Sequence, residues 1–363
     1  MHSEKMNVIG KVIIVLILGF TWGCSNLSTL HPEPLLTSTA VPVRLPMTDT
    51  PKPSAIITAA ATPTQTLTPT STPTPTITAT KIADFSHKGW FGYICQVENG
   101  TDFCLVSPDR YKIIRMGLDQ FGWISSPSWS PDGQRIVFEV EQQIYTVEIE
   151  CVNNPSGCME YIHKISPDQP GQFIHPAWSP DGQKIAFAYR KNVDQDFQVW
   201  LMDANGTTMT RLTSINGSSP VWSPDGEEIA FESSDPLESD TDNRGSVFIM
   251  SKDGSNVHKL TEELSDSYAP AWSPNGEWIV MMSRDGKDLW EPANHPTLIK
   301  IRTDGSELVR LDPGSIPIWS PDGADIAFLA GPEELWLMDA NGSNLRIIPG
   351  ILTWQGICWQ PGF

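Results

Sequence analysis

Positive charge is scarce in this sequence: 24 Lys and Arg stand against 43 Asp and Glu, a formal net charge of −19 over 363 residues. A chain with this balance repels the phosphates of nucleic acid and the head groups of anionic lipids. We therefore expect no nucleic-acid partner. The plainer consequence of the acidic balance is solubility outside the cytoplasm.

Signatures of catalysis are scarce as well. No Gly-x-Ser-x-Gly elbow occurs, so the nucleophile turn of the α/β-hydrolases is excluded. The sequence also lacks the Cys/His spacing that is typical of zinc sites and the glycine loop that cradles phosphates. We predict that the protein is not an enzyme and has no cofactor.

Apolar runs are short, and the one that opens the chain extends from Val12 to Phe20 behind Lys5 and Lys11. A basic front end before a short apolar stretch predicts an export signal, and the stretch is too short to span a membrane. The ending Gly23-Cys24 resembles a bacterial lipoprotein signal, which implies that Cys24 is lipidated. An ordinary secretory signal cut nearby is the alternative. Residues 1–24 are assigned to the signal.

Apolar periodicity is absent from residues 25–84. The stretch from Ala60 to Thr76 consists almost entirely of Thr and Pro, a composition that cannot bury enough apolar surface to fold. A polyproline-like chain of this length reaches roughly 190 Å when fully extended. We expect a disordered tether, on which the threonines also allow O-glycosylation.

Residues 85–363 contain what the first part lacks, a repeated motif. The pentapeptide Trp-Ser-Pro-Asp-Gly, followed by an apolar triplet, begins at Trp129, Trp178, Trp222 and Trp319, and it occurs with Asn for Asp at Trp272. A truncated copy begins at Trp359. Self-similarity at a spacing of 44 to 50 residues indicates a repeat architecture.

Each repeat predicts four short strands. Pro-Asp-Gly between two apolar runs is a tight turn, because Pro presets φ, Asp bonds its own backbone and Gly accepts a positive φ. A second turn, Asn-Gly or Asp-Gly between alternating apolar residues, follows in most repeats, as in the segments from Val199 to Thr213 and from Leu335 to Ile348. We name the four strands of a repeat A to D.

These repeats resemble the TolB-like repeat over about three quarters of the chain, from roughly Trp90 to the end. The resemblance implies an all-β fold, a β-propeller. Complete sets of four strands begin near Pro127, Pro176, Pro220, Pro270 and Pro317. The segment from Trp90 to about Leu118 supplies strands B, C and D, and Gly356 to Gly362 supplies strand A. We therefore predict six four-stranded antiparallel blades, the sixth closed by the two ends of the domain, which removes exposed sheet edges.

The cysteines fit an oxidising compartment. Cys95 and Cys104 face each other across a hairpin if Asn99 and Gly100 form its turn, and Cys151 and Cys158 face each other across a loop. We predict a disulfide for each pair. Cys358 is left over at a position that is small or apolar in the other repeats, so we expect a buried thiol rather than a reactive one.

The repeated residues themselves are expected to be structural. The motif tryptophans are predicted to wedge between neighbouring blades, with their N–H groups bonded. The motif aspartates Asp132, Asp181, Asp225 and Asp322 are predicted to cap turns, as Asn275 does in the remaining copy.

Function is expected where the repeats differ. In a propeller the A–B and C–D turns lie on one face and the B–C and D–A connections on the other, and here the second set varies in length and content. Aromatic and imidazole side chains in these connections suit an organic ligand on a concave face, although they also suit a plug for the channel. The predicted ligand-binding residues are Trp123, Phe173, His175, Tyr268, Trp290, His295 and Trp354.

The acidic loop 234–245 is a candidate metal site. Asp240 and Asp242 place oxygen ligands at alternating positions, faintly as in a calcium loop, but the twelve-residue pattern with its closing Glu is missing. A solvated surface loop is the favoured interpretation. Related propellers with lyase activity need several converging histidines, and only His175 and His295 are expected near one another; His163 and His258 are expected on outer strands.

Two functions remain open. We favour a surface-tethered, non-enzymatic module that binds a protein, peptide or glycan partner through its variable loops. The alternative is a hydrolase or lyase at the channel mouth that acts on an extracellular glycan or peptide, with Asp240, Asp242 or Asp285 as its carboxylates. We expect a monomer in the cell envelope or on the cell surface, held by the lipid anchor, or a secreted soluble protein if Cys24 carries no lipid.

Overall fold

A computed structural model of the chain describes residues 90–97, 100–106, 113–153, 157–234, 245–260, 262–264, 266–284, 296–330, 334–353 and 356–361. The chain divides into two units, Met1–Thr76 and Ile77–Phe363, and every described residue belongs to the second. The expected signal, the tether and Cys24 therefore lie outside the described residues, as do Asp240, Asp242, Asp285, Trp290, His295 and Trp354.

The turn of the repeated motif forms as its residues dictate. In the first copy, the Oδ1 atom of Asp132 accepts bonds from the Ser130 hydroxyl at 2.5 Å and from the Gln134 amide at 3.0 Å, while Gly133 has a φ of 64°. These bonds lower the pKa of Asp132. In the copy that begins at Trp272, Asn275 makes the same two bonds. The predicted turn-capping role is confirmed.

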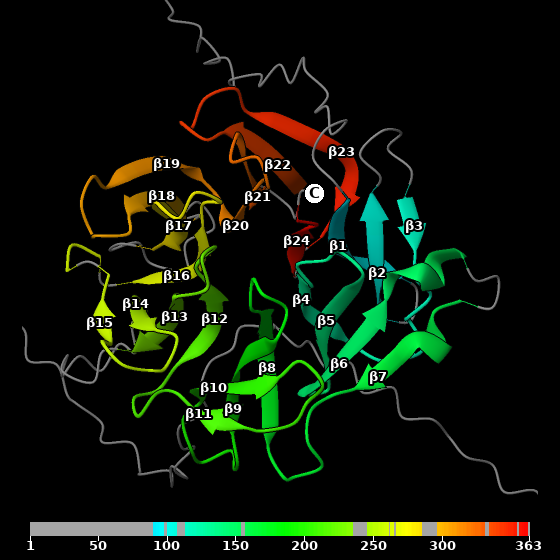
Figure 1. The fold of residues 1–363 in the computed structure, drawn as a ribbon. Coiled ribbons are helices and arrows are strands. Elements are labelled where there is room, and N and C mark those ends of the chain that lie inside the picture. Colours follow the sequence, from blue (N-terminus) through cyan, green and yellow to red (C-terminus); the bar gives the residue numbers. More distant parts are fainter. Residues whose placement is uncertain are drawn as a thin grey trace, which may run out of the picture. The chain divides into compact units, whose positions relative to one another are not determined.

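Six four-stranded antiparallel sheets surround a common centre (Figure 1). Blades I to III comprise β24(Ile357–Trp359), β1(Phe91–Val97), β2(Gly100–Val106), β3(Ile113–Arg115); β4(Ile124–Trp129), β5(Arg135–Val140), β6(Gln143–Glu148), β7(Ile162–Lys164); β8(Gln172–Trp178), β9(Lys184–Arg190), β10(Gln198–Asp203), β11(Thr210–Arg211).

Blades IV to VI comprise β12(Ser218–Trp222), β13(Glu228–Ser234), β14(Gly245–Ser251), β15(His258–Lys259); β16(Ser267–Trp272), β17(Trp278–Ser283), β18(Thr297–Arg302), β19(Val309–Pro313); β20(Ser315–Trp319), β21(Asp325–Ala330), β22(Glu334–Asp339), β23(Arg346–Leu352). Two 3₁₀ helices, η1(Ile149–Asn153) and η2(Met159–Tyr161), lie between β6 and β7. No helix within the described ranges is long and apolar enough to cross a membrane.

The ring closes through blade I. Strand β24 pairs with β1 in the register Phe91↔Trp359 and Tyr93↔Ile357, and the Gln360 amide donates to the Trp90 carbonyl at 2.8 Å. The last strand of the domain is therefore the innermost strand of the blade that the first three strands begin. The predicted six-bladed propeller with shared ends is confirmed.

The motif tryptophans lie between blades as predicted, but their N–H groups differ. Trp222 and Trp272 donate to the carbonyls of Ala177 and Val221, each on the inner strand of the preceding blade, at 3.3 and 3.2 Å. Trp178 and Trp319 are at least 92% buried, and their Nε1 atoms have no hydrogen-bond partner among the described residues. The prediction of a bonded N–H therefore holds for part of the set only.

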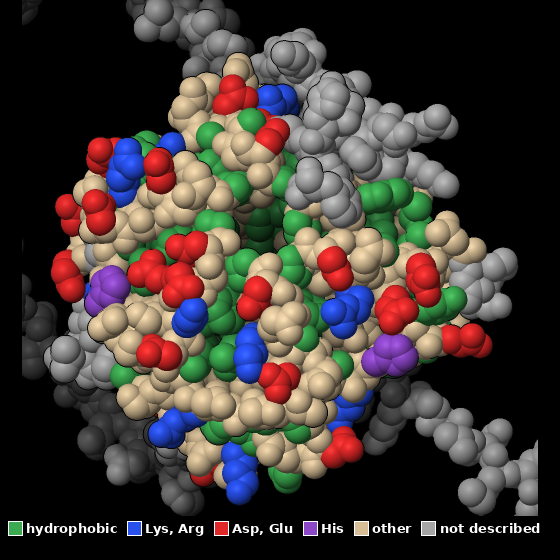
Figure 2. Space-filling model, viewed as in Figure 1, with side chains coloured by type: hydrophobic (Ala, Val, Ile, Leu, Met, Phe, Trp, Pro, Cys, Tyr) green, Lys and Arg blue, Asp and Glu red, His purple; other side chains and the backbone are tan. Residues whose placement is uncertain are grey.

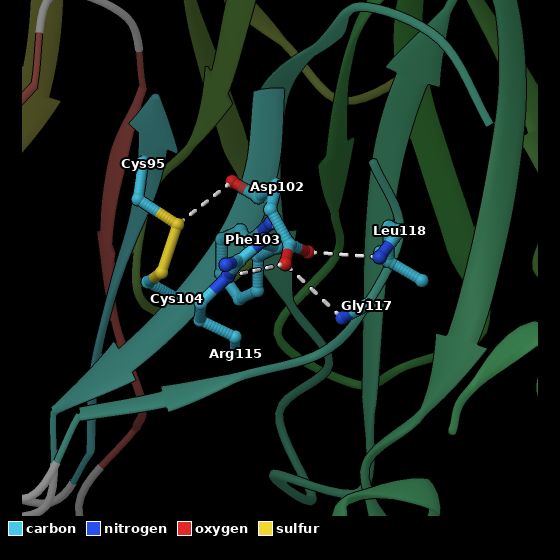
Figure 3. Close-up of a disulfide and its surroundings, with 7 residues drawn as sticks. All are labelled: Cys95, Asp102, Phe103, Cys104, Arg115, Gly117 and Leu118. Atoms are coloured by element: carbon cyan, nitrogen blue, oxygen red, sulfur yellow. Dashed lines mark hydrogen bonds and ion pairs between the residues drawn. A yellow bond between two sulfur atoms is a disulfide. The ribbon is translucent and has the colours of Figure 1, made fainter. Parts of the chain in front are cut away.

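Blade I carries the first disulfide, Cys95–Cys104, and a fully buried carboxylate beside it (Figure 3). Asp102 accepts bonds from the amides of Phe103, Gly117 and Leu118 at 2.8, 3.1 and 2.9 Å. The Arg115 guanidinium adds a bond at 3.1 Å. Asp102 thus ties β2 to the chain that leaves β3 for the next blade.

The pairing of β1 with β2 corrects one expectation. Cys95 pairs with Asp102 and Tyr93 with Cys104, so the two cysteines are diagonal neighbours rather than directly opposite, with their Cα atoms 5.7 Å apart. The strands close at Val97↔Gly100, two positions away from the register that an Asn99–Gly100 turn requires. The disulfide forms nevertheless, because diagonal neighbours on one face of a sheet are also within reach.

The remaining cysteines behave as expected. Cys151 and Cys158 form the second disulfide, with Cα atoms 4.8 Å apart. Cys358 is a buried free thiol on β24. Burial raises the pKa of Cys358 far above its usual value, outweighing the Trp129 indole and the Gly92 amide that favour the thiolate.

Candidate functional site

One backbone feature recurs on the inner strands, three residues before each motif tryptophan. The residue there has a φ between 49° and 61° in all six blades, a region that residues other than glycine rarely adopt. In five blades it creates a bulge in the pairing of strands A and B. The six positions are Ser126, His175, Ser219, Ala269, Ile316 and Gly356.

These positions differ in chemistry although their backbones agree. Blades II, III and IV place polar side chains there, Ser126, His175 and Ser219, whereas blades V, VI and I place Ala269, Ile316 and Gly356. The inner ring therefore has a polar half and an apolar half. Residues in sparsely populated backbone conformations cluster at active sites and ligand-binding sites. We therefore take this ring as the candidate site.

Two glutamates reinforce the polar half. Glu139 on β5 accepts from the His175 amide of the next blade at 3.4 Å, and Glu232 on β13 accepts from the Ala269 amide at 2.7 Å. Both carboxylates thus cap the amide of a left-handed residue in the following blade. Ser218 also donates to Glu232, at 3.4 Å.

Burial perturbs the titration of this cluster. Desolvation raises the pKa of Glu139 from 4.5 to about 7, against the opposing bonds from the His175 amide and Ser125. Desolvation likewise raises the pKa of Glu232 and lowers the pKa of His175 to about 4. Glu139, His175 and Glu232 are each partly buried. His175 is consequently neutral near pH 7.

The cluster is not a catalytic triad. The Nδ1 atom of His175 lies 3.3 Å from the Ser219 hydroxyl, and Ser219 also bonds Glu232. A triad requires the imidazole between hydroxyl and carboxylate, whereas here the hydroxyl lies between the other two. Glu139 accepts from the His175 amide rather than from its ring.

Polar side chains extend from the inner ring onto the face that carries the B–C and D–A connections. We call this face the loop face. Gln172, at the start of β8, bonds Gln142 and Arg190. Asn216, before β12, bonds Ser234. Arg190 also lies over the Phe197 ring, with its Cζ atom 4.3 Å from the centroid. The loop face over blades II to IV therefore offers donors and acceptors for a polar ligand.

The described members of the predicted site have different environments. Trp123 is 56% exposed in the β3–β4 connection, and His175 belongs to the polar half of the inner ring. Phe173 is fully buried and packs against Phe187 and Tyr189, so it cannot touch a ligand in this arrangement.

Tyr268 is held in place between blades IV and V. Its hydroxyl accepts from the Gly245 amide at 3.0 Å, and Arg284 lies over its ring. Desolvation by burial, together with a hydrogen bond to Asp266, raises the pKa of Tyr268. Sequence reasoning missed Glu139 and Glu232, which alignment of the repeats by their tryptophans would have placed ten residues after Trp129 and Trp222.

No group of three or more His, Cys, Asp or Glu within the described ranges could hold a metal ion. The calcium candidates Asp240 and Asp242 lie outside those ranges. His163 and His258 lie on β7 and β15, at the outer edge of their blades, as expected.

Figure 2 shows the molecule in the same view as Figure 1, with a hollow near the centre of the ring. Hydrophobic side chains line the visible walls of this hollow, and acidic side chains spread over the surrounding surface with basic ones between them. The centre of the ring is therefore apolar on the visible side.

The sequence matches the family described as TolB beta propeller domain over residues 118–361. No curated protein matches the sequence. Among solved structures, TolB from Acinetobacter baumannii is similar, with a TM-score of 0.62 and 19% identity over 77% of this chain and 68% of that one.

Two other propellers are similar at lower identity. A chain of the nidogen/laminin complex has a TM-score of 0.57 and 11% identity over 76% of this chain and 99% of that one. An oligogalacturonate lyase from Vibrio parahaemolyticus has a TM-score of 0.50 and 12% identity over 73% of this chain and 77% of that one. At such identities the three structures share the fold with this chain, and nothing more follows from them.

Proposed function

Since the chain belongs to the TolB β-propeller family, we propose that it is a non-enzymatic binding module that holds a protein, peptide or glycan partner on its loop face. The observation that carries this proposal is the inner ring, in which six equivalent left-handed positions have one backbone and different side chains. A scaffold that needed only closure would have no use for His175 and Ser219 at positions where Ala269 and Gly356 suffice.

The polar and aromatic side chains of the loop face support a polar partner. Gln142, Gln172 and Asn216 present amides, Arg190 presents a guanidinium, and Trp123 adds an exposed aromatic surface. Side-chain amides form hydrogen bonds with the hydroxyls and peptide groups of a ligand. Aromatic side chains supply most of the binding energy in such interfaces.

The proposed setting follows from the first 84 residues. An export signal ending at Cys24 and a tether of Thr and Pro would place the propeller outside the cytoplasm at a distance from a membrane. The nidogen/laminin structure contains a propeller in a protein complex, which agrees with a protein partner. We propose a monomer at the cell envelope, anchored through a lipid at Cys24.

A quantitative capture experiment tests the binding proposal. The full chain, immobilised through its C-terminus, is compared with Trp123→Ala/Arg190→Ala and with the control Lys252→Ala, which alters an exposed ion pair on a turn of the opposite face. Proteins and glycans retained from an envelope extract are quantified by mass spectrometry. Partners lost from the double variant alone support the loop face, and identical retention by all three refutes it.

The alternative is a hydrolase or lyase at the same mouth, acting on an extracellular glycan or peptide. The observation in its favour is the raised pKa of Glu139, since catalytic acids are tuned in this way. Turnover of a glycan or peptide panel that is abolished in Glu139→Gln would establish catalysis. Turnover that survives in Glu139→Gln, or none at all, would exclude Glu139 as its acid.

A further inference from the structure

Polar contacts cross three consecutive blade interfaces in the inner ring. The Glu139 carboxylate on β5 accepts from the His175 amide at 3.4 Å and joins blades II and III. The Nδ1 atom of His175 lies 3.3 Å from the Ser219 hydroxyl and joins blades III and IV. Ser219 bonds Glu232, which accepts from the Ala269 amide at 2.7 Å and joins blades IV and V. A continuous series of polar contacts therefore runs from blade II to blade V.

The fold itself does not require these polar residues. The strand position of Glu139 and Glu232, ten residues after the motif tryptophan, is apolar in blades III, V and VI, where it carries Ala188, Met282 and Leu329. The ring position of His175 and Ser219 is apolar in the other half of the ring, where it carries Ala269, Ile316 and Gly356. Polar residues at both positions of adjacent blades therefore indicate a property beyond closure of the ring.

The two glutamates differ in the support for their negative charge. Glu232 accepts a backbone amide at 2.7 Å, bonds two serine hydroxyls and is close enough to Arg284 to be stabilised by its charge. Glu139 accepts the His175 amide at 3.4 Å and bonds Ser125 on β4, and neither of these groups is charged. Since a cation and short hydrogen bonds favour a carboxylate, Glu139 is the less supported of the two. Burial accordingly raises the pKa of Glu139 to about 7.

The imidazole of His175 is poorly placed for a positive charge. Its ring faces the Ser219 hydroxyl, with Glu232 on the other side of that hydroxyl, and Glu139 bonds the backbone of His175 rather than its ring. Burial lowers the pKa of His175 to about 4. Between about pH 4 and pH 7, the folded ring therefore holds both Glu139 and His175 in their uncharged forms.

We propose that the contacts of Glu139 and His175 form a pH-dependent joint in the inner ring, which is closed while both side chains are uncharged and opens when either becomes charged. Ionisation of Glu139 at higher pH favours exposure of its carboxylate to water, which releases the His175 amide. Protonation of His175 at lower pH favours exposure of the imidazole, which breaks its contact with Ser219. A partner of the loop face would then meet a ring whose opening depends on pH, a consequence that rests on the proposed function. The joint itself does not.

Amide hydrogen exchange of the full chain, measured by NMR at pH 5 and pH 8, tests the joint at the backbone amide of residue 175. His175→Ser introduces the residue of the two neighbouring blades, and Glu139→Gln keeps an oxygen acceptor for this amide. In His175→Ser, we expect the protection factor to fall by up to about 70-fold from pH 5 to pH 8, because only the ionisation of Glu139 remains. In Glu139→Gln, we expect it to rise by up to about 30-fold, because only the protonation of His175 remains.

The double variant His175→Ser/Glu139→Gln should show the same protection at both pH values. Amides of β6, the third strand of blade II, report global unfolding in every variant. The loss of either expected slope, or a slope in the double variant, would overturn the proposal. An equal change at the β6 amides would also overturn it, since the whole domain would then be opening. The experiment needs no partner, so its failure is distinct from a failed capture on the loop face.

Discussion

Single side chains at the inner ring perform two tasks at once. Glu139 and Glu232 cap amides of left-handed residues in the next blade, and in doing so they bring carboxylates to the centre of an acidic protein. The cost of this arrangement is desolvation, which appears as raised pKa values for both glutamates. The two buried glutamates therefore lower the stability of the folded protein, as residues at functional sites commonly do.

Glu139→Gln is expected to stabilise the protein above neutral pH. The folded-state pKa of Glu139, about 7, exceeds its ordinary value of 4.5, so folding favours the protonated form. The stability that this group contributes is present below pH 4.5 and is lost as the pH rises to 7. Urea unfolding should show the variant more stable than the native chain by up to about 3 kcal/mol at pH 8, and nearly equal at pH 5.

The comparison at two pH values also separates the effect of Glu139 on the free energy of unfolding from that of His175. The pKa of His175 is lowered to about 4, so its contribution is present above pH 6.5 and is lost as the pH falls toward 4 in both proteins. A stability difference that does not change between pH 5 and pH 8 would contradict the assigned pKa of Glu139.

Asp102→Asn is expected to destabilise the protein by about 2–3 kcal/mol, because an amide nitrogen would then face backbone donors in a fully buried site. The matched control is Asp132→Asn, which reproduces the turn that Asn275 already forms and should change stability by less than about 0.5 kcal/mol. Chemical denaturation measures both, and equal effects of the two substitutions would contradict the role of Asp102.

The sequence predicted the repeated framework around the site and His175 within it, and it missed the two glutamates that cap amides there. Positions such as Trp222 and Asp225 recur, so their roles in wedges and turns follow from local chemistry. Glu139 lies in a strand whose neighbours are apolar, and nothing in its own segment says that the next blade supplies the amide that it caps. Phe173 was predicted at the mouth because its loop is variable, yet the alternation of the strand turns it into the core.

At the scale of elements, hairpin registers depend on single turn residues. The motif turns were predicted correctly because Pro, Asp and Gly each specify a backbone angle. The β1–β2 hairpin contains both Glu98-Asn99 and Asn99-Gly100 as candidate turn pairs, and the favourable Asn-Gly signal led to a register two positions away from the observed one. The observed ladder ends at Val97↔Gly100, so the Asn-Gly signal alone does not specify this register.

Removal of the first disulfide tests how much β1 and β2 depend on it. Cys95→Ala/Cys104→Ala should lower the free energy of unfolding by about 2–3 kcal/mol, because the bridge constrains a short loop of the unfolded chain. Thermal unfolding under non-oxidising and oxidising conditions provides the measurement. Unchanged stability of the double variant in both conditions would mean that the bridge contributes nothing to blade I.

At the scale of the whole molecule, the ring assigns different tasks to its two faces. The face of the A–B turns repeats one motif, with Asn275 for Asp in one complete copy and a truncated copy at Trp359. The loop face varies at every blade around a common strained backbone. Composition alone predicted the acidic exterior, and repeat counting predicted six blades and their closure. The partner of the loop face cannot be deduced in this way, because binding specificity resides in side chains that no repeat constrains.

Closure of the ring through blade I is the claim on which both faces depend, and amide hydrogen exchange of the full chain tests it directly. The Ile94 amide donates to the Gly356 carbonyl at 3.2 Å and the Gln360 amide to the Trp90 carbonyl at 2.8 Å, so both bonds join the two ends of the domain. Both amides should exchange as slowly as the paired amides of β5 and β6. Exchange of Gln360 at the rate of an unfolded peptide, while blades II to VI stay protected, would contradict a closed ring.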